Sequence, residues 1–330
     1  MRTHINRLVA ISVAVCLGVA ANLSARAFAA EGSFERTLKV TGAVELDVTT
    51  GSGNIEVRTG DSSTVHVRGV IRASNNWRES SGDAEQKVHY LESNPPIEQS
   101  GNVIRIGHIE DSELRHNISI SYEIQVPTET RLTSSTGSGH LNISGIHGPL
   151  RARSGSGGVK AANIGDEAEL ETGSGDIEAD SIGGSARLHS GSGRISGSGI
   201  AGGIVATTGS GNIRLEQTAP GDVRVETGSG GAEVSGVKGA LDARAGSGNI
   251  TVAGEPTNEW RLHSGSGTLT VHLTSAVGFD LDAHTSSGHI ETAVPIEMQG
   301  TIGHGHMQGK ARGGGVRLNL ETGSGNIRIE

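Results

Sequence analysis

Four charged residues have the types and the spacing that could support acid–base chemistry: Arg151, Arg153, Glu169 and Glu171. Arg151 and Arg153 are two residues apart, as are Glu169 and Glu171, so on a β-strand the side chains of each pair point to the same face. Paired carboxylates, or a carboxylate beside an arginine, are groups with which β-helix enzymes cleave polysaccharides. Such enzymes also need loops that wall a cleft, and the segments around these residues carry almost no insertions. We therefore predict no catalytic residues, and keep a carbohydrate-active β-helix enzyme acting on an envelope polysaccharide as the alternative.

Histidines at equivalent positions could bind a metal. His263 and His284 occupy the same position in what read as successive repeats, and His304 and His306 lie in or beside a degenerate repeat at residues 303–305. Two imidazoles one strand apart could share a zinc ion. No third ligand follows at a fixed spacing, so we predict no metal and no cofactor.

The triplet Gly-Ser-Gly could bring backbone N–H groups to an anion, but it occurs many times. It begins at Gly51, Gly137, Gly155, Gly173, Gly191, Gly209, Gly228, Gly246, Gly265 and Gly323, with Ser286-Ser287-Gly288 as a variant. The triplets lead into strand-like segments and not into a helix, and no Lys-Ser/Thr pair follows as in a phosphate-binding loop. Calcium is disfavoured as well, because the position three residues after the first glycine varies from Asp176 to the cationic Arg194.

The spacing of the triplets defines the elements that position all these residues. From Gly137 to Gly265 they recur at steps of 18 or 19 residues, which is the signature of a repeat architecture. Four residues after each first glycine stands an apolar residue in nearly every copy, as in Ile177, Ile195 and Ile213. Five residues before it stands another, and polar residues alternate with apolar ones on both sides. This period of two predicts one short strand on each side of every triplet.

Two strands in about 18 residues cannot bury an apolar face alone, so neighbouring repeats must stack. The sequence therefore predicts an all-β fold, a flattened parallel β-solenoid with ~18-residue two-strand coils. We expect the triplets at the corners, where glycine adopts backbone conformations closed to other residues. A Thr or Ser usually precedes the triplet, as at Thr136 and Ser154, and predicts a ladder of hydroxyls. Outward columns such as Arg151, Glu169 and Arg187 predict opposite charges on adjacent coils.

The first part of the chain differs from the repeat. Residues 1–29 contain a basic start, an apolar run and Ala27-Phe28-Ala29, and we predict a signal peptide. Residues 30–135 are expected to form an irregular β region that caps and continues the solenoid, with a loop over 75–86 and no helix. Residues 136–330 are the repeat solenoid. Export to the periplasm or the extracellular space follows from the signal peptide, with no transmembrane segment in the mature chain.

Composition narrows the possible partners. The only cysteine, Cys16, lies in the predicted signal peptide, so no disulfide is expected. Without residues 1–29, which hold three arginines and no acidic residue, the formal charge is −12. An acidic chain with only 2 Trp, 2 Tyr and 3 Phe lacks the basic patch and stacking surface of nucleic-acid binders. The closing segment, residues 326–330, reads as a bare edge strand, which predicts head-to-tail self-association.

Two blocks of sequence carry a resemblance to a known family. The segment "ISYEIQVPTETRLTSSTGSGHLNISGIHGPLRARSGSGGV" at 120–159 and the closing "GGGVRLNLETGSGNIRIE" at 313–330 resemble a bacterial family of unknown function called putative adhesins. The resemblance extends over roughly residues 34–330. It implies the solenoid fold and carries no catalytic motif.

These observations together predict an exported, non-enzymatic β-solenoid. It would act as an adhesin or cell-envelope scaffold through a rigid repetitive surface. Its partner would be an envelope protein or a polysaccharide, not nucleic acid.

Overall fold

The computed structural model describes residues 28–74, 81–298 and 305–330. The predicted signal peptide lies outside these residues except for Phe28 and Ala29, with which the first strand begins. Within the described part of the chain, no helix is long and apolar enough to cross a membrane.

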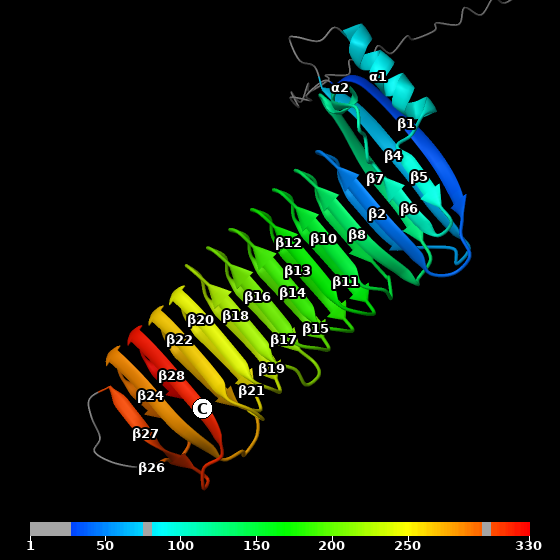
Figure 1. Ribbon diagram of the computed structural model, residues 1–330. Coiled ribbons are helices and arrows are strands. Elements are labelled where there is room, and N and C mark those ends of the chain that lie inside the picture. The colour runs from blue at the N-terminus through cyan, green and yellow to red at the C-terminus, as the bar shows by residue number, and fades with distance from the viewer. Residues whose placement is uncertain (1–27, 75–80, 299–304) are drawn as a thin grey trace, which may run out of the picture.

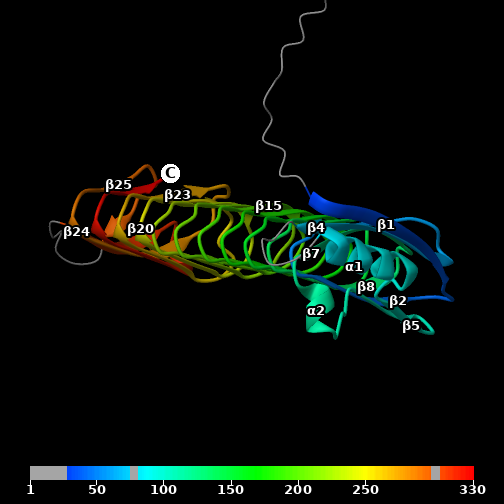
Figure 2. The same ribbon diagram turned by 90° about the horizontal axis from the view of Figure 1, so that it is seen from above.

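Two long sheets form an elongated rod, and Figure 2 shows them as two layers facing each other. Sheet A has 14 strands in the order β1 (Phe28–Lys39), β4 (Thr64–Ser74), β7 (Ile118–Val126), β3 (Ile55–Thr59), β9 (Leu141–Ser144), β11 (Val159–Ile164), β13 (Ile177–Ile182), β15 (Ile195–Ile200), β17 (Ile213–Gln217), β19 (Ala232–Val237), β21 (Ile250–Gly254), β23 (Leu269–Leu273), β29 (Ile327–Ile329) and β25 (Ile290–Thr292). Sheet B has 15 strands in the order β26 (Glu297–Met298), β27 (His306–Ala311), β24 (Phe279–Ser287), β28 (Val316–Ser324), β22 (Trp260–Ser266), β20 (Leu241–Ser247), β18 (Val223–Thr227), β16 (Ile204–Thr208), β14 (Ala186–Ser190), β12 (Ala168–Thr172), β10 (Leu150–Ser154), β8 (Thr130–Thr136), β2 (Val44–Thr50), β6 (Val103–Ile106) and β5 (Ile97–Ser100).

From β8 to β25 the chain alternates between the sheets, and each pair of strands in this part is one coil of a parallel β-solenoid (Figure 1). Equivalent residues lie over each other from coil to coil: Ile177 pairs with Ile195, and Ile195 pairs with Ile213. All three are at most 1% exposed. The predicted fold class is therefore confirmed, and the interior is a set of stacked apolar files between the two sheets.

The glycines of the triplets are needed for a reason other than the expected one. Among the triplet glycines only Gly325 has a positive φ, so conformational freedom does not explain them. Successive coils instead approach too closely for a side chain. A Cβ atom on Gly139 would lie 1.8 Å from the carbonyl oxygen of Gly53, and one on Gly157 would lie 1.9 Å from that of Gly139. Only glycine permits this stacking of corners.

The predicted hydroxyl ladder is present and lies inside the corner. The hydroxyl of Thr172 donates to the carbonyl oxygen of Gly157 on the neighbouring coil at 2.8 Å. It also accepts from the backbone N–H of Gly175 in its own coil at 3.1 Å. Ser154 and Ser190 make the same pair of bonds one coil away on either side. The ladder thus satisfies backbone groups that the tight corner leaves without strand partners.

At the N-terminal end, part of the segment expected to be a loop is a helix. Helix α1 (Ser81–Ser93) buries Ala84, Val88 and Leu91 against the core, and it contacts β1 and β4. Figure 2 shows it at the end of the rod. The expectation that 75–86 is a loop without helix is wrong for residues 81–86. The apolar positions recur at helical spacing, but three of them in a polar segment give a weak sequence signal.

The order of coils along the rod differs from their order in the chain at both ends. Strands β6 and β7 pair outside β2 and β3, so the coil at 44–59 is the second in space. At the other end β28 and β29 lie between β22/β23 and β24/β25. The expected bare edge at residues 326–330 is therefore wrong, because β29 is paired on both sides. Residues 303 and 304 of the expected degenerate repeat lie outside the described residues, and the strand that follows them, β27, runs antiparallel to β24 and so does not form part of a parallel coil.

Candidate functional site

The four charged residues considered for acid–base chemistry form one ion-pair cluster on sheet B. Arg151 pairs with Glu169 at 2.8 Å, and Arg153 reaches both Glu169 at 2.9 Å and Glu171 at 3.0 Å. The strand register places Arg151 beside Glu169 and Arg153 beside Glu171, which confirms the predicted opposite charges on adjacent coils there. The hydrogen bond from Arg151, followed by that from Arg153, lowers the pKa of Glu169. This carboxylate is therefore held ionised, which is the wrong state for a general acid.

Two further arginines extend this cluster along the same face. A shallow hollow of about 200 Å³ is lined by residues that include Arg131, Thr133 and Arg187, on the coils either side of the cluster. Arg131 and Arg187 are exposed, and neither forms an ion pair within the described residues. Their guanidinium groups are thus available to a partner that lies across several coils. We call Arg131, Arg151, Arg153 and Arg187 the arginine face.

His263 and His284 do not lie on adjacent strands as expected, whereas His284 and His306 do: they pair in register, and their ring centroids are 6.0 Å apart. Strand β28 lies between β22 and β24, so Glu321 separates His263 from His284 in the register. His263 faces Glu321 at 3.4 Å, and His306 contacts Asp282 at 3.1 Å. His304 lies outside the described residues. Among the residues that the structure describes, no group of three or more His, Cys, Asp or Glu could hold a metal ion.

The position considered for calcium has a structural role that the sequence did not reveal. The side-chain oxygens of Asp176 and Asn212 accept hydrogen bonds from the backbone N–H groups of Arg194 and Gly231, in each case on the next coil. Other members of this column do the same, namely Asn54, His140 (through Nδ1), Asn249 and Asn326. These acceptors hold successive corners together. The preference for Asn and Asp at one fixed position after the triplet was the signal.

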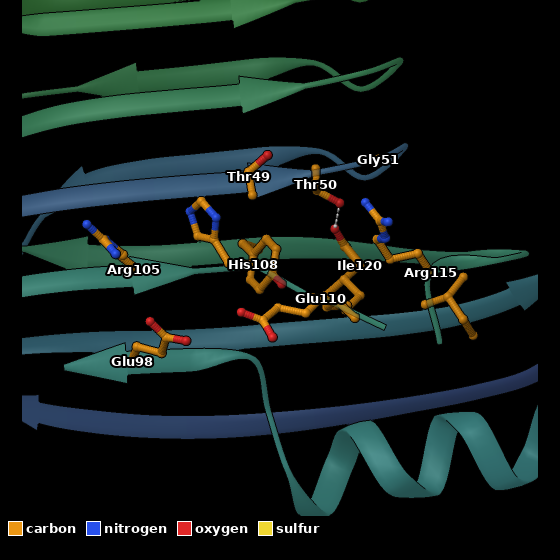
Figure 3. Close-up of a pocket in the computed structure, with 13 residues that line it drawn as sticks. Thr49, Thr50, Gly51, Glu98, Arg105, His108, Glu110, Arg115 and Ile120 are labelled. Atoms are coloured by element: carbon orange, nitrogen blue, oxygen red, sulfur yellow. Dashed lines mark hydrogen bonds between the residues drawn. The ribbon is translucent and has the colours of Figure 1, made fainter. Parts of the chain in front are cut away.

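A cleft opens between β6 and β7, where a longer segment replaces a coil corner. The coil formed by β6 and β7 has no Gly-Ser-Gly triplet, and residues 107–117, including α2 (Ser112–Arg115), connect its strands. The cleft beside this segment has a volume of about 470 Å³ and is shown in Figure 3. It is lined by Thr49, Thr50, Gly51, Glu98, Arg105, Gly107, His108, Ile109, Glu110, Arg115, Ile118, Ile120 and Tyr122. We call it the corner cleft.

Tyr122 reaches the corner cleft from the apolar interior. It stands in the same file as Ile55, with which it pairs in register, and it is 1% exposed. Its hydroxyl has no hydrogen-bond partner among the described residues, and burial raises the pKa of Tyr122 above its usual range. A Cβ atom on Gly107 would lie 3.1 Å from this hydroxyl and 1.8 Å from the carbonyl oxygen of Thr49. Gly107, with φ of 84°, therefore keeps open the space beside the hydroxyl.

The rim of the corner cleft carries charges of both signs. His108 contacts Asp47 at 3.4 Å, whereas Arg105, Arg115, Glu98 and Glu110 are exposed and form no ion pair within the described residues. Figure 3 shows His108 between Arg105 on one side and Arg115 on the other. This cleft is not evident from the sequence, because residues 60–126 do not follow the repeat. The signal was two strand-like segments, 103–106 and 118–126, without a triplet between them.

Comparisons with known proteins place the chain in a family. A "putative cell adhesion protein" from Clostridium sporogenes is 14% identical with a TM-score of 0.20, and the match covers 91% of this chain and 99% of that one. A "putative adhesin" from Bacteroides fragilis is 13% identical with a TM-score of 0.33, and the match covers 91% of this chain and 97% of that one. A "putative lipid binding protein" from Parabacteroides distasonis is 14% identical with a TM-score of 0.28, and the match covers 90% of this chain and 96% of that one. No curated protein matches the chain. The family profile of the Toastrack DUF4097 proteins, a family of unknown function, matches residues 37–330. The chain belongs to the Toastrack DUF4097 family.

Proposed function

We propose that this protein is an exported, non-enzymatic adhesin or scaffold of the cell envelope, which binds a polysaccharide or protein partner along the arginine face. Residues 1–29 direct export to the periplasm or the cell exterior and are then removed. Residues 30–135 cap the rod, and residues 136–330 present the repeated surface.

The observation that carries this proposal is the in-register stacking of outward side chains on a stiff support. Interior positions such as Leu170 and Leu188 pair in register and are at most 1% exposed, so the outward residues between them keep a fixed spacing. Adjacent strands of a sheet are ~4.8 Å apart, so an extended partner meets outward side chains at a fixed spacing. Weak contacts on several coils then add up to useful affinity.

Binding and export are tested separately. Cells that produce the full chain are fractionated, and we expect the protein in the periplasm or medium, but in the cytoplasm when residues 1–29 are deleted. The purified protein is then incubated with isolated envelope polysaccharide and with envelope membranes. Arg131→Ala/Arg187→Ala should reduce sedimentation with its target at least tenfold, because these two guanidinium groups are free to pair.

A matched variant controls for general loss of positive charge. Arg58→Ala/Arg194→Ala removes one exposed arginine from β3 of the opposite sheet and one from the corner before β15, and should leave binding unchanged. Equal binding by the wild type and both variants would refute the role of the arginine face. Cytoplasmic retention of the full chain would refute export.

A further inference from the structure

The corner cleft has the dimensions and construction of a small-molecule site. Its volume of about 470 Å³ falls within the range of roughly 300–1,000 Å³ that is typical of ligand pockets. It arises because the segment 107–117 takes the place of a tight corner, whereas the corners that carry triplets are closed by contacts between glycines. The cleft is therefore a local departure from the repeat and not a gap between its coils.

The hydroxyl of Tyr122 is the strongest indication that the cleft takes a polar ligand. A buried hydroxyl without a partner is unfavourable, and a phenylalanine would fill the same space in an apolar file without that cost. The hydroxyl lies beside Gly107, which itself lines the cleft. A ligand hydroxyl or carbonyl group in the cleft would give Tyr122 the partner that the described residues do not provide.

The remaining lining offers both donors and acceptors. Thr49 accepts a hydrogen bond from Ser135 at 3.0 Å, which leaves its own hydroxyl hydrogen free to donate. Glu98 and Glu110 are acceptors, and Arg105 and Arg115 are donors, without ion-pair partners in the described part of the chain.

This combination selects among classes of ligand. The carboxylates of Glu98 and Glu110 offset the charges of Arg105 and Arg115, so the rim offers no net positive charge to a compact anion such as phosphate, and the density of polar groups disfavours an alkyl chain. Sugar hydroxyls both donate and accept, and the C–H face of a sugar ring packs against apolar side chains such as Ile109 and Ile118. We propose that the corner cleft binds one or two units of a saccharide, with the Tyr122 hydroxyl as a direct hydrogen-bond partner.

The chain contains only two tyrosines, which makes the test direct. Protein labelled with ¹³C in its tyrosine rings gives separate signals for Tyr122, which is buried, and Tyr90, which is 52% exposed. N,N′-diacetylchitobiose, maltose and glucuronic acid are titrated in turn, with inorganic phosphate and laurate as the other arms. We expect at least one saccharide to shift the Tyr122 signal in a saturable manner and to leave that of Tyr90 in place.

Affinity is then compared between two matched variants by calorimetry. Tyr122→Phe should weaken binding of that saccharide at least fivefold without lowering the melting temperature, because it removes only the unpaired hydroxyl. Tyr90→Phe should bind like the wild type. Failure of all three sugars to bind, binding of only phosphate or laurate, or full affinity in Tyr122→Phe would each overturn the proposal. Arg131→Ala/Arg187→Ala should keep this saccharide affinity, so failure of the arginine face and failure of the cleft are distinguishable.

Discussion

Gly193 stacks directly on Gly175 of the neighbouring coil, so closely that a Cβ atom on Gly193 would lie 1.8 Å from the carbonyl oxygen of Gly175. Gly193→Ala should therefore destabilise the protein by about 3 kcal/mol, because two backbones must move apart in a packed corner. Urea denaturation followed by circular dichroism measures the effect. Ser192→Ala, at the exposed middle position of the same triplet, should change stability by less than about 0.5 kcal/mol. Similar stability of both variants would refute the close-contact explanation.

Thr172 is expected to stabilise its corner through its hydroxyl. Thr172→Val keeps the shape of the side chain but leaves the carbonyl oxygen of Gly157 and the N–H of Gly175 without their partner. We expect a loss of about 2 kcal/mol in the free energy of unfolding. Thr172→Ser should retain most of the stability, since Ser154 and Ser190 make the same bonds on the adjacent coils. A smaller loss for Thr172→Val than for Thr172→Ser would show that the methyl group, and not the hydroxyl, is what matters.

Ser181 is a serine in a backbone conformation that favours glycine. Its φ is 57°, and the equivalent position one coil on is Gly199 with φ of 65°. Ser181→Gly should raise the free energy of unfolding by about 0.5–1 kcal/mol, because the left-handed conformation is strained for a residue with a Cβ. Ser192→Gly, at a position without positive φ, should not stabilise the protein. A lower melting temperature for Ser181→Gly would contradict this reasoning.

The ion-pair cluster should make stability depend on pH. The folded-state pKa of Glu169 is lowered, first by the hydrogen bond from Arg151, so the folded protein binds a proton there less readily than the unfolded chain does. The stabilisation is fully present above the unfolded value of about 4.3 and is lost as pH falls through the lowered folded value. Unfolding free energies of the wild type and Glu169→Gln should differ at pH 7 and converge at low pH. Glu167→Gln removes an exposed carboxylate that makes no ion pair in the described residues, and it should show no such convergence.

Deletion of residues 313–330 should disrupt more of the rod than it removes. Strands β28 and β29 lie between earlier coils, so their loss separates β22 from β24 and β23 from β25. Hydrogen exchange should show lost protection in β24, β25 and β27, while Leu150–Ser154 in β10 stays protected as a control. Retained protection of β24 would show that the two flanking coils can pair directly.

The two-strand coil can be predicted from the sequence, because the same pattern of apolar residues around a Gly-Ser-Gly triplet recurs many times. Each triplet has an apolar residue at the same distance on either side, and a shift of one residue would turn the file of Ile177, Ile195 and Ile213 towards solvent. The order of the coils at the ends of the rod cannot be predicted in the same way. Leu318 pairs with both Trp260 and Leu281, and all three occupy the same repeat position, so the local pattern fits either order.

The corner cleft could not be predicted, since it depends on which strands become neighbours. Thr49 and His108 are far apart in the chain and come together only because the coil of β6 and β7 lies outside that of β2 and β3. Tyr122 reads as one more apolar residue in an alternating strand. Its importance arises from the absent triplet beside it and from Gly107, neither of which has a repeated counterpart for comparison.

Strands β28 and β29 insert between two coils that precede them in the chain, so this coil joins the rod between others and not at its end. While a chain is being synthesised or passed through a membrane channel with its N-terminus leading, residues 313–330 emerge after the strands on both sides of their place. Until then β22 and β23 have an unpaired edge, and β24 and β25 have no neighbour that joins them to the rod. A chain shortened before residue 313 keeps that open edge and offers it to proteases and to other strands.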